Sequence, residues 1–149
     1  MSLKKIFWIA SYPKSGNTWM RSIISSLFFS NNGKFNFNLL KNIQYFDYYS
    51  KYEFLKLLKD SDFKNLNKIS VISKYWTQAQ EIVDVGGDFA FFKTHSANLK
   101  INMNEYTNTK TSRGFIYMIR DPRDVAISWA KHQGFSINKT IDIMTNQQA

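Results

Sequence analysis

Three short apolar runs, each followed by polar or charged residues, set the pattern of this 149-residue chain. They occupy residues 6–10, 89–92 and 115–119. A continuous apolar run of this length is typical of a strand that is covered on both faces, as in a parallel sheet. We therefore predict an α/β fold in which helices flank a central parallel sheet, with residues 6–10 as a central strand.

A helix is predicted soon after the first run. Apolar residues recur at spacings of three and four, the pattern of one face of an amphipathic helix. They are Met20, Ile23, Ile24, Leu27 and Phe28. The pattern ends near Ser30, before an Asn-Asn-Gly turn.

A second helix is predicted after the third run. Asp121 suits the N-cap, Pro122 the first helical position and Asp124 the third. A proline has no amide hydrogen to leave unbonded there, and an acidic side chain is favoured by the positive end of the helix dipole. We expect its buried stripe to comprise Pro122, Val125, Ala126, Trp129 and Ala130.

The middle of the chain carries a weaker pattern. We expect short helices over residues 53–59 and 73–83, and a break at Gly86-Gly87. The aromatic residues over 45–54 either pack helices onto the sheet, which we favour, or line a substrate pocket. Because no repeat or linker interrupts the chain, a single domain over residues 1–149 is predicted.

The loop after the first run has the composition of an anion-binding site. It reads Tyr-Pro-Lys-Ser-Gly-Asn-Thr-Trp over residues 12–19. A turn from strand to helix exposes backbone N–H groups and the positive end of the helix dipole. Gly16 permits close approach, Lys14 adds a cation, and the hydroxyls of Ser15 and Thr18 can bond phosphate oxygens. The order differs from a Walker A loop, because Lys14 precedes the glycine.

The other two runs deliver further polar groups at their carboxyl ends. Lys93 and His95 follow the second run, and Arg120 follows the third, with Ser128 two turns along the helix. The carboxyl ends of parallel strands meet at one edge of a sheet, where α/β proteins bind ligands. We therefore expect these side chains to share one site with Lys14.

A structural interpretation of the arginine segment stays open. The guanidinium of Arg120 or Arg123 can pair with Asp121 or Asp124 at the helix start, without any ligand. His132, at the exposed end of the same helix, is assigned no role.

In this order, the three segments resemble the family of sulfotransferases that use 3'-phosphoadenosine 5'-phosphosulfate (PAPS). The family's first signature reads close to Tyr-Pro-Lys-Ser-Gly-Thr-Thr-Trp, from which only Asn17 departs. Its Lys-Thr-His segment and its arginine and serine pattern match residues 93–95 and 120–128. The resemblance runs from residue 6 to about residue 133 and implies a P-loop-like three-layer fold. Family domains are usually longer and carry a late Gly-x-x-Gly-x-x-Lys-type segment, so we expect this chain to be an N-terminal part, incomplete at its carboxyl end.

The resemblance also implies how the donor is held. Its 5'-phosphosulfate would be cradled by Lys14, Ser15, Gly16, Asn17 and Thr18, with Lys14 at the bridging oxygen. Asn17 can still donate from its amide in place of the family's threonine hydroxyl. Trp19 would pack against the adenine, and Arg120 and Ser128 look like ligands of the 3'-phosphate.

The implied chemistry is in-line transfer of a sulfuryl group to an acceptor hydroxyl or amine. His95 would take the acceptor's proton, because neutral imidazole suits that task near neutral pH. Lys14 would stabilise the leaving oxygen, and Lys93 would support the transferred group. No metal is expected, because the sequence shows neither a Walker B aspartate nor metal-ligand spacing. The acceptor, a small molecule or a glycan, is not specified by these residues.

Composition is consistent with an anionic ligand. Lys and Arg number 20 against 11 Asp and Glu, a net charge of +9, which suits a nucleotide or nucleic acid. A kinase-like P-loop phosphotransferase and a basic nucleic-acid-binding module are therefore the alternatives, but we expect no nucleic-acid partner. The chain has no cysteine and no run of about 20 apolar residues, so we expect a cytoplasmic protein without a membrane span. Sheet surface left open by an incomplete domain would favour self-association.

Overall fold

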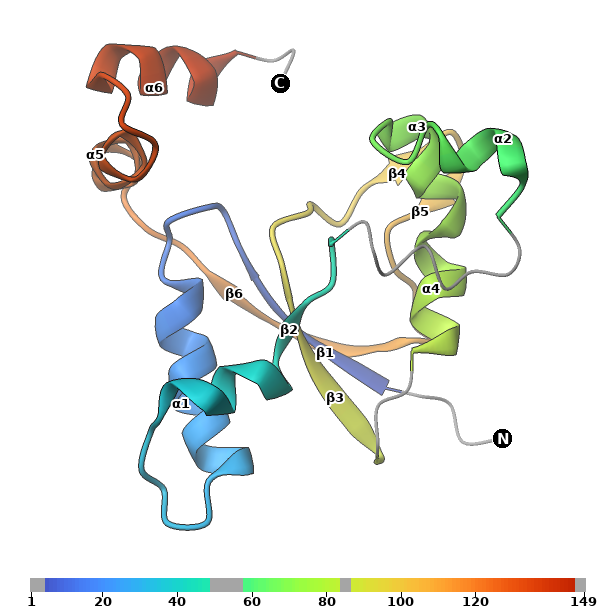
Figure 1. Cartoon of the computed structure of the whole chain (residues 1–149), viewed down its shortest axis with the longest axis horizontal. Helices are drawn as coiled ribbons and strands as arrows, with labels where there is room; N and C mark the ends of the chain where they lie inside the picture. Colours follow the sequence, from blue (N-terminus) through green and yellow to red (C-terminus); the bar gives the residue numbers. More distant parts are fainter. Residues whose placement is uncertain (1–4, 49–57, 84–86, 147–149) are drawn as a thin grey trace.

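The computed structural model describes residues 5–48, 58–83 and 87–146. Its central sheet has four strands in the order β2-β3-β1-β6 (Figure 1). The strands are β1 (Lys5–Ser11), β2 (Gln44–Tyr45), β3 (Phe89–Thr94) and β6 (Ser112–Met118). β1 pairs in parallel with β3 on one side and β6 on the other. The predicted central strand and parallel sheet are therefore confirmed.

The remaining elements surround this sheet. The helical elements are α1 (Asn17–Phe29), η1 (Phe37–Asn42), α2 (Asp60–Phe63), α3 (Ile69–Ile72), η3 (Ser73–Tyr75), α4 (Trp76–Ile82), α5 (Pro122–Gln133) and α6 (Ile137–Thr145). β4 (Lys100–Ile101) and β5 (Asn104–Glu105) form a separate antiparallel pair. The helix predicted over residues 73–83 is confirmed as η3 and α4. Most of the helix predicted over 53–59, with Gly86, lies outside the described residues.

Side chains of the strands alternate between two hydrophobic cores. Trp8 and Phe92 belong to one core, which η3 and α4 cover and which includes Phe46. Ile9 and Phe91 belong to the other, beneath α1. Because α1 and α4 lie on opposite sides of the strands in Figure 1, the molecule has the three layers that the sequence predicted. Phe46 lies in the first core, as the packing interpretation predicts, whereas Tyr48 is exposed and the Tyr45 ring lies against His95.

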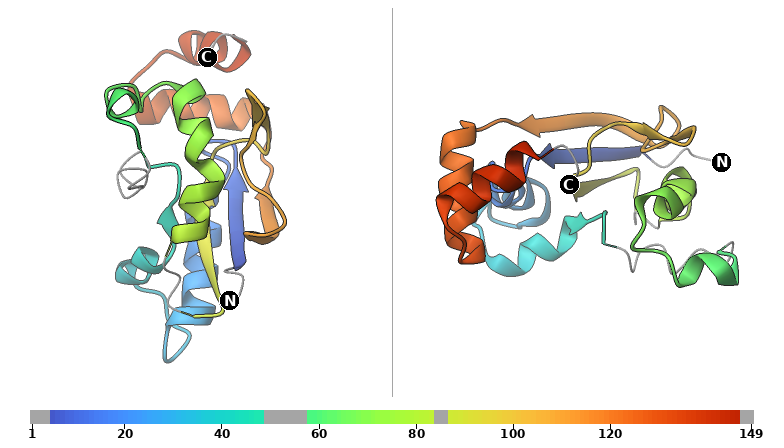
Figure 2. Two further views of the ribbon diagram at one scale, coloured as in Figure 1. Left: turned by 90° about the vertical axis from the view of Figure 1, so that its right-hand side faces the viewer. Right: turned by 90° about the horizontal axis from the view of Figure 1, so that it is seen from above.

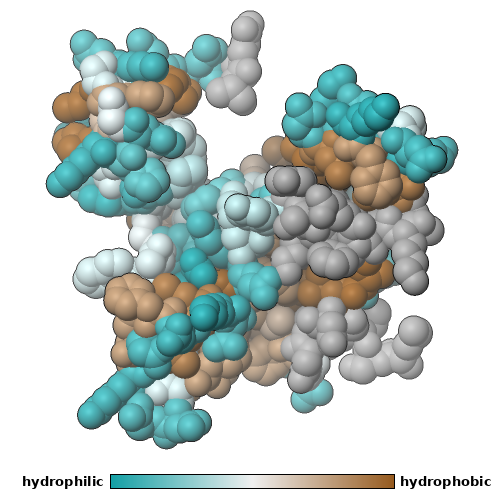
Figure 3. Space-filling view, in the orientation of Figure 1, coloured by the Kyte–Doolittle hydropathy of each residue, from teal (hydrophilic) through white to brown (hydrophobic). Residues whose placement is uncertain are grey.

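Helix α1 ends beside Ser30, as predicted, but its apolar stripe is only partly buried. Ile24 is 4% exposed, whereas Ile23, Leu27 and Phe28 are 51%, 72% and 55% exposed. The Phe28 ring touches Phe91 at a centroid distance of 5.0 Å, so the helix rests on the sheet along one narrow edge. Apolar surface consequently shows around α1 and η1 at the lower left of Figure 3. The predicted stripe is wider than the face that the sheet covers.

Helix α5 begins as predicted. The Asp121 side chain accepts a hydrogen bond from the backbone N–H of Arg123 at 2.9 Å, and Pro122 is the first helical residue. In the predicted stripe, Val125, Ala126 and Ala130 are buried, but Trp129 is half-buried and Pro122 is exposed, because α5 projects beyond the sheet. In the right-hand view of Figure 2 the arrows of β1 and β6 both point toward α5, and α6 packs against it.

Candidate functional site

A cleft of about 650 Å³ opens where β1, β3 and β6 end. It is lined by Pro13, Lys14, Gly16, Asn17, Thr18, Trp19, Lys93, His95, Arg120, Ser128, Trp129, His132 and Gln133. Every predicted site residue except Ser15 is in this set. Ser15 is buried and borders a separate hollow beside Tyr12 and Met118. Segments far apart in the sequence thus meet in one place, as the parallel topology requires.

The loop between β1 and α1 leaves backbone donors open. Gly16 has φ +104° and Lys14 has φ +67°, a region that glycine adopts without strain and lysine rarely adopts. Gly16 is the N-cap residue of α1, and no side chain caps this helix. The first N–H groups of α1 therefore lack a side-chain acceptor, which is the condition under which a helix N-terminus binds an anion.

Asn17 lines the cleft, but its amide is already engaged. The side chain is buried, and Nδ2 donates to the Ile9 carbonyl oxygen at 2.9 Å and to Ser11 Oγ at 3.2 Å. A carbonyl oxygen only accepts, so the amide hydrogens must point toward β1. Contrary to our expectation, the amide is not free to donate to a ligand. It ties the start of α1 to the end of β1.

Three cationic side chains gather in the cleft, from three different strand ends. Among its described lining residues, Lys14, Lys93 and Arg120 are accompanied by no Asp or Glu. Lys93 is half-buried, and its Nζ lies 4.4 Å from the centre of the Tyr45 ring. Burial lowers the pKa of Lys93, and the charge of Arg21 acts in the same direction. The local charge therefore favours an anion.

The two arginines of the third segment differ in their contacts. Arg123 makes a close ion pair with Asp121 at 2.6 Å, and its side chain is 88% exposed. Arg120 donates from Nη1 to the Lys14 carbonyl oxygen at 3.2 Å, while its Nε lies 3.8 Å from Asp124. Pairing with an aspartate at the helix start, the structural interpretation given above, therefore accounts for Arg123. Arg120 is left with a long, solvent-exposed ion pair and faces the cleft.

The contacts of the His95 ring determine which nitrogen carries a proton. Nδ1 lies 2.7 Å from the Ser11 carbonyl oxygen, which can only accept, so Nδ1 is the protonated nitrogen of the neutral ring. Nε2 is then the nitrogen with a free lone pair. Burial lowers the pKa of His95 below 6.5, partly offset by the bond to Ser11, and the nearby charges of Lys93 and Asp47 act in opposite directions. The ring is neutral at physiological pH.

The structure adds cleft residues that the sequence interpretation missed. Trp129, His132 and Gln133 of α5 line the same wall as Ser128. A signal was available, because His132 lies four residues after Ser128 and so shares its face of the helix. His132 is exposed, as expected for the end of this helix, and it lies at the edge of the cleft as well.

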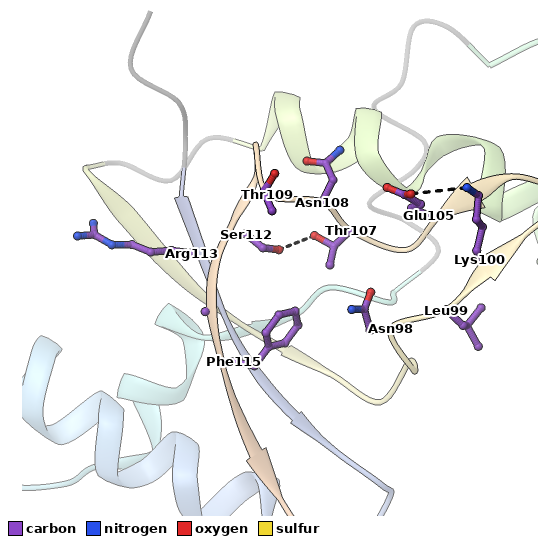
Figure 4. Close-up of a pocket in the computed structure, with 11 residues that line it drawn as sticks. Asn98, Leu99, Lys100, Glu105, Thr107, Asn108, Thr109, Ser112, Arg113 and Phe115 are labelled. Carbon is purple, nitrogen blue, oxygen red and sulfur yellow. Dashed lines mark hydrogen bonds and ion pairs between the residues drawn. The ribbon is translucent and has the colours of Figure 1, made fainter.

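A second hollow, of about 670 Å³, lies between β6 and the β4–β5 pair (Figure 4). Its polar lining is largely paired: Lys100 lies 3.7 Å from Glu105, and Thr107 and Ser112 share a hydrogen bond, both drawn as dashed lines. The Arg113 side chain points away from it in this view. None of the predicted site residues lines this hollow.

The residues that the structure describes contain neither a metal-binding cluster nor a membrane-spanning helix. No group of three or more His, Cys, Asp or Glu in that part of the chain could hold a metal ion. Likewise, none of its helices has the length and hydrophobicity needed to cross a bilayer.

Comparison with known proteins gives one match. The family model described as "Sulfotransferase domain" matches residues 4–147, nearly the whole chain. No curated protein and no solved structure matches significantly.

Proposed function

Because the chain belongs to the sulfotransferase family, and is an enzyme of that class acting on small-molecule acceptors, we propose that its sulfuryl donor is PAPS and that the cleft is its donor site. The observation that carries the proposal is the gathering of Lys14, Lys93 and Arg120 without a carboxylate among the described lining residues. Such a cleft suits a ligand with several negative charges.

The two ends of the donor would occupy opposite sides of the cleft. The 5'-phosphosulfate fits the turn before α1, where Gly16 lets backbone donors approach and the Lys14 ammonium is close. The 3'-phosphate fits between Arg120 and Ser128, because a guanidinium and a hydroxyl together supply several donors. Trp19 is 80% exposed, which leaves its ring face available to stack on adenine.

In the reaction, His95 would act as general base. The acceptor oxygen bonds to sulfur while the bond from sulfur to the bridging phosphate oxygen breaks, and the acceptor's proton passes to His95 Nε2. The leaving group is the adenosine bisphosphate, whose new charge the Lys14 ammonium stabilises, and Lys93 stabilises the oxygens of the transferred group. Tyr45 packs its ring against His95 at 5.5 Å, but burial and Asp47 raise the pKa of Tyr45 to about 12. The phenol is therefore a poor alternative base.

A titration of the chain with three ligands tests the donor assignment. We expect adenosine 3',5'-bisphosphate to bind more tightly than ATP with magnesium, and single-stranded DNA to bind weakly. A preference for ATP with magnesium would favour a kinase-like phosphotransferase. Salt-sensitive DNA binding without bisphosphate binding would instead favour a nucleic-acid-binding module.

Replacing His95 tests the base. We expect His95→Ala to abolish sulfuryl transfer while the dissociation constant for the bisphosphate stays within about twofold, because general-base catalysis acts on the transition state. Added imidazole should restore part of the activity of this variant. A fully active His95→Ala protein would remove the histidine from the mechanism.

A further inference from the structure

One carboxylate holds the segment that carries His95. Asp47 lies two residues after β2, and its Oδ2 accepts hydrogen bonds from Thr94 Oγ1 at 2.6 Å and from the backbone N–H of His95 at 3.0 Å. Its Oδ1 accepts from Ser96 Oγ at 2.8 Å and from the Tyr106 hydroxyl at 2.7 Å. Both oxygens are thus used, and three of the four donors belong to consecutive residues.

These bonds complement the contact on the imidazole. The ring is held at Nδ1 by the carbonyl oxygen of Ser11, at the end of β1. The backbone of the same residue is held by Asp47, which follows β2, the strand on the other side of β3. Two anchors from two strands, one on the ring and one on the main chain, leave His95 little freedom to turn.

We propose that Asp47 is a positioning residue of this enzyme: it fixes residues 94–96 so that the His95 ring stays on the Ser11 carbonyl and keeps Nε2 available to the cleft. This inference rests on the proposed role of His95 as the base. Asp47 is not among the residues that line the cleft, so it acts through His95 rather than on the substrate.

The geometry requires an acceptor oxygen at this position, because the backbone N–H of His95 can only donate. An asparagine is not a sufficient test. Its oxygen could accept from Thr94 and His95 while its NH₂ group donates to the hydroxyls of Ser96 and Tyr106, which accept as well as donate. Asp47→Ala removes all four hydrogen bonds and therefore releases the segment.

The experiment reads the His95 ring directly by ¹⁵N–¹H NMR of the chain without donor. The chain has only two histidines, so His132→Gln assigns their signals. We expect the wild-type protein to show one neutral tautomer, protonated at Nδ1. In Asp47→Ala, the widely separated Nδ1 and Nε2 shifts should move toward each other, because the ring samples both tautomers. Asp88→Ala is the matched control: this exposed aspartate precedes the amino end of β3 and should leave the spectrum unchanged.

An unchanged single tautomer in Asp47→Ala would overturn the proposal. If that variant does not fold, as judged by circular dichroism, Ser96→Ala decides the question. It removes one of the four donors and should move the ring shifts in the same direction by a smaller amount, and no movement would again overturn it.

Kinetics separate this inference from the proposed function. We expect Asp47→Ala to lower kcat by about 10-fold to 100-fold, the cost of a misplaced catalytic group, with donor affinity kept within about twofold. A wild-type chain that binds no bisphosphate would refute the proposed donor site, while the ring spectra would still report on Asp47. A variant with normal kcat and altered ring shifts would show that the segment moves without affecting catalysis and would overturn the positioning role.

Discussion

Arg120 and Arg123 form a natural pair for testing the donor site, because they are the same residue type, three positions apart, with different contacts. Arg120 lines the cleft beside Ser128, whereas Arg123 is held by Asp121 at 2.6 Å and does not line the cleft. If the 3'-phosphate binds as proposed, Arg120→Ala should weaken binding of adenosine 3',5'-bisphosphate, and Arg123→Ala should not.

The expected loss of affinity is the difference between the hydrogen bond that Arg120 gains with the phosphate and the ion pair with Asp124 that it gives up. A hydrogen bond to a charged group contributes about 1.5–3 kcal/mol. Against this stands the ion pair with Asp124 at 3.8 Å, an exposed contact that contributes less than about 1 kcal/mol. The net loss of about 0.5–3 kcal/mol corresponds to a dissociation constant about 2-fold to 150-fold weaker.

Isothermal titration calorimetry of the three proteins at one salt concentration measures this difference. Arg120→Lys is a third variant, which keeps the charge but loses the planar guanidinium. Its dissociation constant for the bisphosphate should fall between those of the wild type and Arg120→Ala. Arg123→Ala should bind within about twofold of the wild type, the scatter expected of a residue with no ligand contact. Equal losses in Arg120→Ala and Arg123→Ala, or none in Arg120→Ala, would refute the assigned 3'-phosphate site.

Three further outcomes are expected. Asn17→Ala should lower the free energy of unfolding by about 1–3 kcal/mol, because two hydrogen bonds are lost. Chemical denaturation measures this loss, with the exposed Asn67→Ala as the control. Equal losses in the two variants would contradict the role of Asn17 in tying α1 to β1. Gly16→Ala should lower the free energy of unfolding by about 1–2 kcal/mol, because an L-residue is strained at positive φ, and it should weaken bisphosphate binding. The control is Gly87→Ala, since Gly87 also has open space within 4 Å but no positive φ; this variant should change neither stability nor binding. As the pH falls, kcat/KM should decrease with a midpoint below pH 6.5. The reason is that a general base works only when unprotonated, and burial lowers the pKa of His95 from 6.5. A midpoint at or above pH 6.5 would contradict this assignment.

The elements beside the site were predictable because local chemistry determines them. Residues 6–10 are apolar at every position, as a strand covered on both faces requires, and the Asp-Pro start of α5 carries its own capping group. How far each helix is covered was not predictable. The apolar spacing around Leu27 gives the direction of a helix face, whereas burial depends on what packs against it, and Leu27 is 72% exposed.

The position of the cleft was predictable for a topological reason. Parallel strands that each end in a cation bring those cations to one edge, whatever the intervening chain does. Two features of the site have no such signal. The amide of Asn17 is engaged by β1 because of the local backbone path, and Asp47 reaches His95 across 48 positions of sequence. Neither can be inferred from spacing, since both depend on which strands become neighbours.

The Lys-Thr-His segment of β3 illustrates how such support stays hidden. Successive side chains of a strand point to opposite faces, so Lys93 and His95 line the cleft while Thr94, between them, is buried against Asp47 and the Tyr106 hydroxyl. Thr94, which separates Lys93 from His95 in the sequence, therefore anchors the end of β3 to the residues beneath it. The pairing of β3 with β1, from Lys5 opposite Phe89 to Ala10 opposite Thr94, sets this register, and a shift of one residue would turn Thr94 toward the cleft and Lys93 and His95 away from it. The short strand β2 has no residue in the cleft. It contributes through the chain that follows it, because Asp47 there holds Thr94 in this orientation.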